Sequence, residues 1–325
     1  MARFFVTGGS GFIGTNLVRS LLDNGHQVLN VDISPPRDPS LNAVWVEGDV
    51  RHHDTLSARV KDFRPQFVIH LAARTDLNGR NLADYAANYQ GVENIIAAIM
   101  SVDTVDRVIF TSSQLVCRTG YIPHGDTDYR PNTLYGESKV MGEKIVREHA
   151  DHLPAWAIIR PTSIWGPWFD TPYKEFFLSI LNAYYVHPRG RRIHKSYGYV
   201  GNTVHMIESL FTCDPSLMHG RTMYIADYPP LELKHWADQI AVISGKRPPL
   251  QVPYALLKMA ALFGDLLKKL GWKEPPLTSF RLFNLVSEMV YDTSPIEHIC
   301  GPLPYSNEEG IKKTIDWLSQ KNGYV

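Results

Sequence analysis

The stretch VTGGSGFIG, residues 6–14, decides the fold of this chain. It follows the apolar run RFFV at residues 3–6, which predicts a short buried strand. Behind the glycines, one face of a predicted helix carries Ile13, Leu17, Val18, Leu21 and Leu22. Gly25 ends that helix, and residues 27–31 predict a second strand that leads to Asp32. A strand, a glycine turn, a helix, a strand and an acid in this order are typical of a dinucleotide-binding site.

The residues of this unit also indicate which dinucleotide binds. Glycines allow a tight turn and a close approach of the backbone to a pyrophosphate, and the helix N-terminus offers amides to that anion. Asp32, at the tip of the second strand, can accept both hydroxyls of an adenosine ribose and would repel a 2′-phosphate. We therefore expect NAD as the cofactor, although Arg37 five residues later leaves a 2′-phosphate open.

The composition excludes several classes of protein. The 325 residues have a formal net charge of zero and are 44% apolar, and nothing in this balance suggests nucleic acid or an anionic membrane as a partner. The three cysteines are far apart, so we expect no metal site, no disulfides and a reducing cytoplasm. The N-terminus shows no signal-peptide pattern. Residues 254–270 contain four charges and cannot span a membrane; a helix packed on its own domain is expected, with a membrane-surface helix as the alternative.

Short apolar runs alternate with helical patterns along the first half of the chain. Further strands are predicted at residues 44–49, 67–73, 107–111 and 155–160, with one more at 223–226, and helices at 92–100 and 135–150. Such strands are typical of a parallel sheet covered by helices on both faces. We therefore expect an α/β protein with a doubly wound parallel sheet of Rossmann type and a smaller, discontinuous C-terminal substrate domain. The cofactor domain spans residues 1–165, with 196–228 returning to it, and the substrate domain spans 166–195 and 229–325.

Tyr135 and Lys139 form a candidate catalytic pair. They lie four residues apart, on one face of a predicted helix. A free phenol has a pKa of about 10, and a nearby ammonium lowers it. Tyr135 is therefore expected to exchange a proton with a substrate hydroxyl while hydride moves to or from a nicotinamide. Ser113 follows the fifth strand, where parallel sheets place ligands, and is expected to hydrogen-bond the substrate oxygen.

At this point the sequence resembles the extended short-chain dehydrogenases/reductases, and more narrowly the NAD-dependent epimerase/dehydratase group that acts on nucleotide sugars. The resemblance covers nearly the whole chain. It implies an enzyme of polysaccharide biosynthesis that uses NAD and forms a homodimer through helices at about 82–100 and 135–149.

The same resemblance assigns roles to individual positions. Ser113, Tyr135 and Lys139 match the catalytic triad of the family. The expected cofactor contacts are Gly8, Gly11, Phe12, Ile13, Gly14, Asp32, Ile33, Asp49, Val50, Leu71, Ala72, Ala73, Asn88, Thr111, Tyr135, Lys139 and Pro161. Arg192, Lys195 and Arg281 are expected to contact the diphosphate of the substrate.

The residues after Ser113 narrow the reaction. Dehydratases of the group carry an Asp-Glu pair directly after this position, and the decarboxylases keep the glutamate, whereas this chain has Gln114 and Leu115. Neither side chain can exchange protons, so both reactions are disfavoured. Redox chemistry at a carbinol remains, either in a C4-type epimerase or in a simple dehydrogenase or reductase of a nucleotide sugar. Cys117 is expected to be a buried, inert thiol.

Two other functions stay open. The C-terminal portion, from residue 254 to Leu318, also resembles the 3β-hydroxysteroid dehydrogenases and dihydroflavonol reductases, whose substrates are hydrophobic alcohols. The basic cluster at residues 189–195 favours a diphosphate instead. A redox sensor that binds NAD and a protein partner is the third hypothesis, but such sensors usually lose the tyrosine or the lysine that this chain retains.

Overall fold

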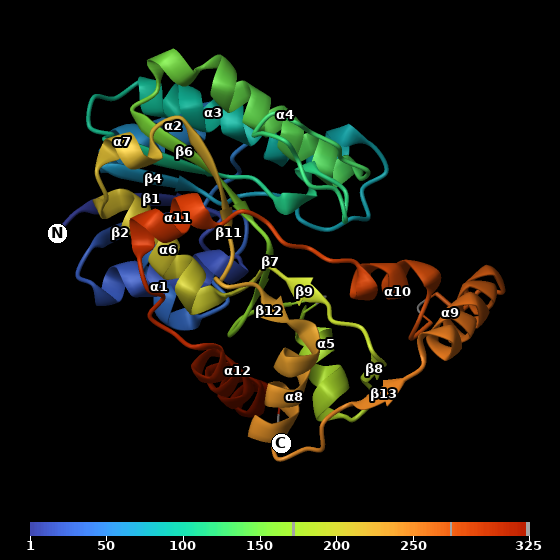
Figure 1. Ribbon diagram of the computed structural model, residues 1–325. Coiled ribbons are helices and arrows are strands. Elements are labelled where there is room, and N and C mark those ends of the chain that lie inside the picture. Colours follow the sequence, from blue (N-terminus) through green and yellow to red (C-terminus); the bar gives the residue numbers. More distant parts are fainter. Residues whose placement is uncertain (171–172, 274, 323–325) are drawn as a thin grey trace.

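A seven-stranded parallel sheet forms the centre of the computed structural model, which describes residues 1–170, 173–273 and 275–322 (Figure 1). The strand order is β11-β6-β5-β4-β1-β2-β3. The strands are β1 (Arg3–Thr7), β2 (Gln27–Asp32), β3 (Trp45–Glu47), β4 (Phe67–His70), β5 (Arg107–Thr111), β6 (Ala155–Pro161) and β11 (Arg221–Ile225). The doubly wound sheet is thus confirmed, including the seventh strand. The order reverses between β1 and β4, and ligands bind at such a switch point.

Helices cover both faces of the sheet because its strands alternate their side chains. Phe4 and Val6 point to one face, where they pack with α1 (Phe12–Asp23), α6 (Val200–Thr212) and α11 (Ser294–Cys300). Phe5 points to the other face, toward α2 (His53–Phe63), α3 (Gln90–Met100) and α4 (Leu134–Glu148). Five short helical turns complete this part: η1 (Pro39–Val44), η2 (Leu82–Asn88), η3 (Gln114–Val116), η4 (Ala150–His152) and α7 (Pro215–Met218).

A second hydrophobic cluster lies beyond the carboxyl ends of the strands. Its centre is aromatic, with Trp165, Phe177 and Trp236 fully buried against one another. Its helices are α5 (Tyr173–Leu181), α8 (Leu233–Ile243) and α12 (Asn307–Asn322). Its short strand pairs are β7 (Ser163–Trp165) with β10 (Tyr197–Tyr199), β9 (His194–Lys195) with β12 (Leu231–Glu232), and β8 (Val186–Pro188) with β13 (Leu250–Val252).

Two segments of the expected substrate domain behave differently from the rest. The helix α11 returns to the sheet, where Ile296 is buried beside α6 and β11. The helices α9 (Tyr254–Lys269) and α10 (Ser279–Val286) form a lobe that projects from the body, drawn in orange in Figure 1. Within the described ranges, no helix is both long and apolar enough to cross a bilayer.

Candidate active site

The glycine turn between β1 and α1 is packed so closely that larger residues do not fit. Gly8 has a φ of 75°, and a Cβ there would lie 2.5 Å from the backbone nitrogen of Ala72. A Cβ on Gly14 would overlap the carbonyl oxygen of Gly8. Gly11 caps α1 and offers no side-chain acceptor to the first amides of the helix. These amides can therefore bind an anion such as a pyrophosphate.

Asp32 lies beside this turn. Its two carboxylate oxygens accept the backbone N–H groups of Ser10 and Ser34, both at 3.0 Å. Burial raises the pKa of Asp32 above its ordinary value, while these amides oppose the shift. The Arg37 guanidinium, which could have bound the 2′-phosphate of NADP, pairs instead with Asp170 at 2.7 Å. This arrangement fits a ribose with free hydroxyls, as in NAD.

The remaining cofactor positions predicted near the sheet differ in exposure. Val50 is buried beside Gly91, whereas Ile33 is exposed at the edge of the site. Asp49 forms a salt bridge with Arg51 at 2.6 Å. The run from Leu71 to Ala73 is partly buried and follows β4 directly, which places it opposite the glycine turn.

The structure brings Ser113, Tyr135 and Lys139 together where β5 ends and α4 begins. The hydroxyl of Thr133 caps α4, which fixes Tyr135 in its first turn. The side chains of Ser113 and Tyr135 are hydrogen-bonded, and Lys139 Nζ donates to the carbonyl oxygen of Thr111 at 2.9 Å. Each triad residue is less than one-tenth exposed.

Burial dominates the electrostatics of this triad. It raises the pKa of Tyr135 to about 12, against the hydrogen bond from Ser113. It lowers the pKa of Lys139 to about 8, against the charge of Glu143. The lower phenol pKa expected from the sequence is therefore wrong for the protein alone, because removal of the phenol from water has the larger effect.

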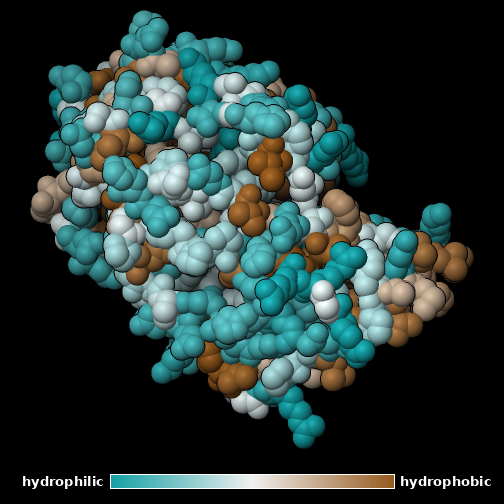
Figure 2. All heavy atoms as spheres, viewed as in Figure 1, coloured by the Kyte–Doolittle hydropathy of each residue, from teal (hydrophilic) through white to brown (hydrophobic). Residues whose placement is uncertain are grey.

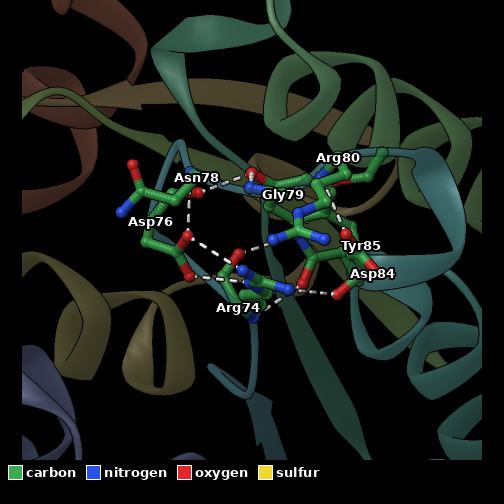
Figure 3. Close-up of polar contacts among 9 residues, drawn as sticks. Arg74, Asp76, Asn78, Gly79, Arg80, Asp84 and Tyr85 are labelled. Atoms are coloured by element: carbon green, nitrogen blue, oxygen red, sulfur yellow. Dashed lines mark hydrogen bonds and ion pairs between the residues drawn. The ribbon is translucent and has the colours of Figure 1, made fainter.

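The loop between β4 and α3 is held by its own polar contacts (Figure 3), and its Tyr85 ring packs against the Tyr135 ring. The hydroxyl of Tyr85 donates to the Asp76 carbonyl oxygen at 2.8 Å and accepts the Gly79 N–H at 3.0 Å. Arg74 places its guanidinium over the Tyr85 ring and pairs with Asp76 at 2.7 Å. The Tyr85 and Tyr135 ring centroids are 6.2 Å apart. Sequence reasoning did not identify this loop, which carries no recognisable spacing.

Asn88 is an expected cofactor contact. Both the oxygen and the nitrogen of its side-chain amide form hydrogen bonds with other residues of the protein. Its Oδ1 accepts the Arg74 N–H at 2.8 Å, and its Nδ2 donates to the Arg74 carbonyl oxygen at 3.0 Å and to Ser138 Oγ at 2.9 Å. Asn88 therefore ties the loop of Figure 3 to α4, on the helix turn that carries Tyr135 and Lys139.

A polar cluster lies next to the triad. Gln114 Nε2 lies 3.4 Å from Ser163 Oγ, and the hydroxyls of Tyr173 and Tyr197 hydrogen-bond the same serine. The side-chain oxygens Gln114 Oε1 and Thr111 Oγ1 are buried and have no hydrogen-bond partner among the described residues. Since a buried polar atom without a partner is costly, these two oxygens are suited to a ligand rich in hydroxyls.

A buried ion pair lies one helix turn beyond Lys139. Glu143 and Arg160 are each about 2% exposed or less, and Arg160 Nε and Nη2 donate to the two carboxylate oxygens at 2.8 Å each. The hydroxyls of Ser112 and Tyr129 donate to the same carboxylate at 2.6 and 3.0 Å. Sequence reasoning missed Glu143, although its spacing of four residues from Lys139 places it on the same helix face.

The expected diphosphate contacts have different surroundings. Lys195 is fully buried and donates to the carbonyl oxygens of Asn284 and Ser287, and burial lowers its pKa to about 8. Arg281 donates to the Pro275 carbonyl oxygen at 3.0 Å. Arg192 is exposed. Lys195 thus anchors the end of α10 and does not offer a free charge.

Cys117 is buried, as expected. Its Sγ lies 3.2 Å from the carbonyl oxygen of Asp128, and burial raises the pKa of the thiol. Because the thiolate is the reactive form, this environment favours an inert cysteine.

Comparison with known proteins finds one matching family model and relatives of more than one activity. Residues 4–189 match the family model of the NAD-dependent epimerase/dehydratase family. A 3-beta-hydroxysteroid dehydrogenase of Mycolicibacterium neoaurum is 30% identical over 87% of this chain and 82% of that protein. An N-acetyl-alpha-D-glucosaminyl-diphospho-ditrans,octacis-undecaprenol 4-epimerase of Escherichia coli O157:H7 is 26% identical, over 95% of this chain and 93% of the relative.

The fold is also shared with a solved epimerase. The UDP-glucose 4-epimerase of Thermotoga maritima superimposes with a TM-score of 0.74, at 20% identity, over 98% of this chain and 99% of that one. This likeness supports the Rossmann-type architecture described above.

Proposed function

The chain belongs to the NAD-dependent epimerase/dehydratase family, and we propose that it oxidises or epimerises a carbinol of a nucleotide sugar, with C4 epimerisation as the leading reaction. One observation carries this proposal: the polar cluster of Gln114, Ser163, Tyr173 and Tyr197, with its unpaired buried oxygen, stands beside the triad. A polyhydroxylated ring provides donors for such oxygens, whereas a sterol ring system does not.

In this proposal the triad moves one proton at the carbinol oxygen. NAD supplies the hydride acceptor and, in its oxidised form, a positive charge that favours the phenolate. Tyr135 accepts the hydroxyl proton, Ser113 holds the same oxygen, and Lys139 stabilises the phenolate by its charge. Gln114 and Leu115 offer no acid or base for the loss of water, so the reaction ends as oxidation, reduction or epimerisation.

A hydrophobic alcohol is the second candidate substrate. It is favoured by the 30% identity to a steroid dehydrogenase and by Lys195, whose ammonium is occupied by two carbonyl oxygens. Titration calorimetry with UDP, GDP and dTDP separates the candidates, because a sterol enzyme should bind none of these nucleotides.

We further propose a homodimer that packs through the outer faces of α3 and α4, and a cytoplasmic location. Free thiols at Cys117, Cys213 and Cys300 fit a reducing compartment. Sedimentation velocity tests the dimer directly.

The assay for the proposed function uses the full chain with NAD⁺ and either UDP-glucose or UDP-N-acetylglucosamine, followed by chromatography of the C4 epimers. Tyr135→Phe should lower the rate about 10²-fold or more while NAD binding remains. Tyr184→Phe, at an exposed tyrosine, is the matched control. Turnover of a sterol 3β-alcohol, with no nucleotide sugar bound or converted, would overturn the proposal in favour of the second candidate.

A further inference from the structure

An apolar surface covers the outer side of the α9–α10 lobe. Nine of the nineteen exposed large apolar side chains in the described ranges gather within residues 256–283, and each of the nine is at least half exposed. They are Leu256, Met259, Leu262, Phe263, Leu266, Leu270, Trp272, Phe280 and Phe283, and we name this set the α9–α10 surface. Figure 2 shows brown, hydrophobic spheres gathered on the projecting lobe.

The spacing along α9 shows that this exposure follows a regular pattern. One stripe, with alternating steps of three and four residues, carries Leu256, Met259, Phe263, Leu266 and Leu270. The opposite side of the helix buries Leu257, Ala261 and Gly264. A Cβ on Gly264 would overlap the carbonyl oxygen of Leu277, so the buried side is in close contact with the chain that leads to α10. The helix therefore has an inner apolar face that packs and an outer apolar face that does not.

Positive charge borders the outer face. Lys258 and Lys269 flank the outer stripe of α9, while Lys268 and Lys273 lie at and just beyond the end of that helix. All four are exposed, and none forms a salt bridge within the described part of the chain. The acidic residue of α9, Asp265, accepts the backbone N–H of Ser279 at 3.1 Å at the start of α10. An apolar helix face with aromatic residues and a lysine border is the pattern of helices that lie in a membrane interface.

We propose that the α9–α10 surface docks this protein on an anionic lipid bilayer, with α9 lying in the plane of the interface. Charge complementarity selects this occupant, because the lysine border attracts anionic headgroups and would repel the same border of a second copy. The proposal agrees with the absence, among the described residues, of a helix able to cross a membrane. It goes beyond the proposed function and does not depend on which substrate is correct.

The α9–α10 lobe is joined by side-chain and backbone contacts to strands near the candidate active site. Lys195 of β9 donates to the carbonyl oxygen of Asn284 on α10, and Met289 forms a bridge with Lys195. Tyr291 then stacks on Tyr224, with ring centroids 4.4 Å apart. The lobe is thus attached to β9 and, through Tyr291, to β11, which lies two strands from β5 in the sheet.

The first test is flotation of the full chain with vesicles of phosphatidylcholine alone or with 30% phosphatidylglycerol. We expect binding to the anionic vesicles at least tenfold stronger than to the neutral ones, and loss of most of that difference at high salt. Phe263→Glu combined with Leu266→Glu should weaken binding to the anionic vesicles at least tenfold. Val242→Glu, at an exposed apolar position of α8, is the matched control and should bind as the wild type does.

Two results would overturn the proposal. One is equal flotation of the wild type and the double variant. The other is an oligomer that the wild type forms without vesicles and that the double variant does not form, as measured by sedimentation velocity. That result would make the surface a contact between copies of this chain. Hydrogen exchange of the wild type provides a readout that does not depend on folding of a variant: anionic vesicles should protect the amides of residues 254–270, and unchanged exchange there contradicts docking.

Discussion

Glu143→Gln tests how the buried ion pair supports the triad. The substitution keeps the shape of the side chain but removes the charge that faces Arg160. Beside the new amide, Arg160 would then have, among the described residues, the Asp126 carbonyl oxygen and the Tyr224 hydroxyl as its remaining acceptors. Removal of one partner from a buried pair costs about 3–5 kcal/mol, so we expect the free energy of unfolding to fall by about that amount.

The same substitution should change the pH dependence of catalysis. The charge of Glu143 raises the pKa of Lys139, which burial otherwise lowers, to about 8. Without that charge, the Lys139 pKa falls further. Because the proposed mechanism needs a charged Lys139, activity declines as the pH rises through this pKa, and the decline should begin at a lower pH in the variant.

Urea unfolding, followed by circular dichroism, measures the first effect, and the alkaline limb of kcat/KM measures the second. Glu148→Gln, at an exposed position of the same helix, is the control for loss of a helix carboxylate. Replacement of both partners by Glu143→Leu and Arg160→Met should cost less than the single change. A loss below about 1 kcal/mol for Glu143→Gln, with an unmoved alkaline limb, would refute this account of the pair.

Two further predictions concern the cofactor and the acid response. Asp32→Asn should weaken NAD binding about tenfold in calorimetry, because an amide accepts fewer ribose hydrogen bonds than a carboxylate; unchanged affinity would remove Asp32 from the site. Burial lowers the pKa of His70 to about 3 and raises that of Asp227 to about 7. Below about pH 6.5 the unfolded chain takes up a proton at His70 that the folded chain does not. The free energy of unfolding therefore decreases as the pH is lowered. At Asp227 the folded chain keeps a proton that the unfolded chain loses, so stability rises as the pH falls from 7 toward 3.8. Asp227→Asn removes this compensation, and its free energy of unfolding should drop by about 2 kcal/mol from pH 6.5 to 5, more than in the wild type; parallel curves in chemical denaturation would contradict it.

The N-terminal half could be predicted because its signals are local. The glycine turn and the continuous apolar runs depend on neighbours in sequence, and the parallel sheet follows from their alternation. The helix α2 was not predicted, since Leu56 and Val60 are its only large apolar residues in the core. The strand β4 ends at His70, three residues before the predicted end, although the Leu71 N–H still donates to the Thr7 carbonyl oxygen.

The site was predictable only where spacing determines contact. Tyr135 and Lys139 share a helix face whatever the tertiary structure, and Ser113 follows a strand that ends beside that helix. The pair of Glu143 with Arg160 joins α4 to β6, and no local rule connects them. Lys195 shows what local sequence leaves out, because a lysine in a basic run suggests a free charge, whereas the fold buries its ammonium under α10.

The distribution of charge along the chain explains why the overall composition did not predict an anionic membrane as a partner. The whole chain has a formal net charge of zero, so its average field attracts no particular surface. Lysines nevertheless border the α9–α10 surface, and the basic run before β9 attaches to the base of the same lobe, where the Arg191 guanidinium lies 4.0 Å from the Tyr254 ring centroid. If the proposed docking is correct, a neutral protein with one basic, apolar lobe would take a preferred orientation at an anionic bilayer. Because α10 also holds Lys195, that orientation would keep β9 and the neighbouring strands of the candidate site close to the lipid headgroups.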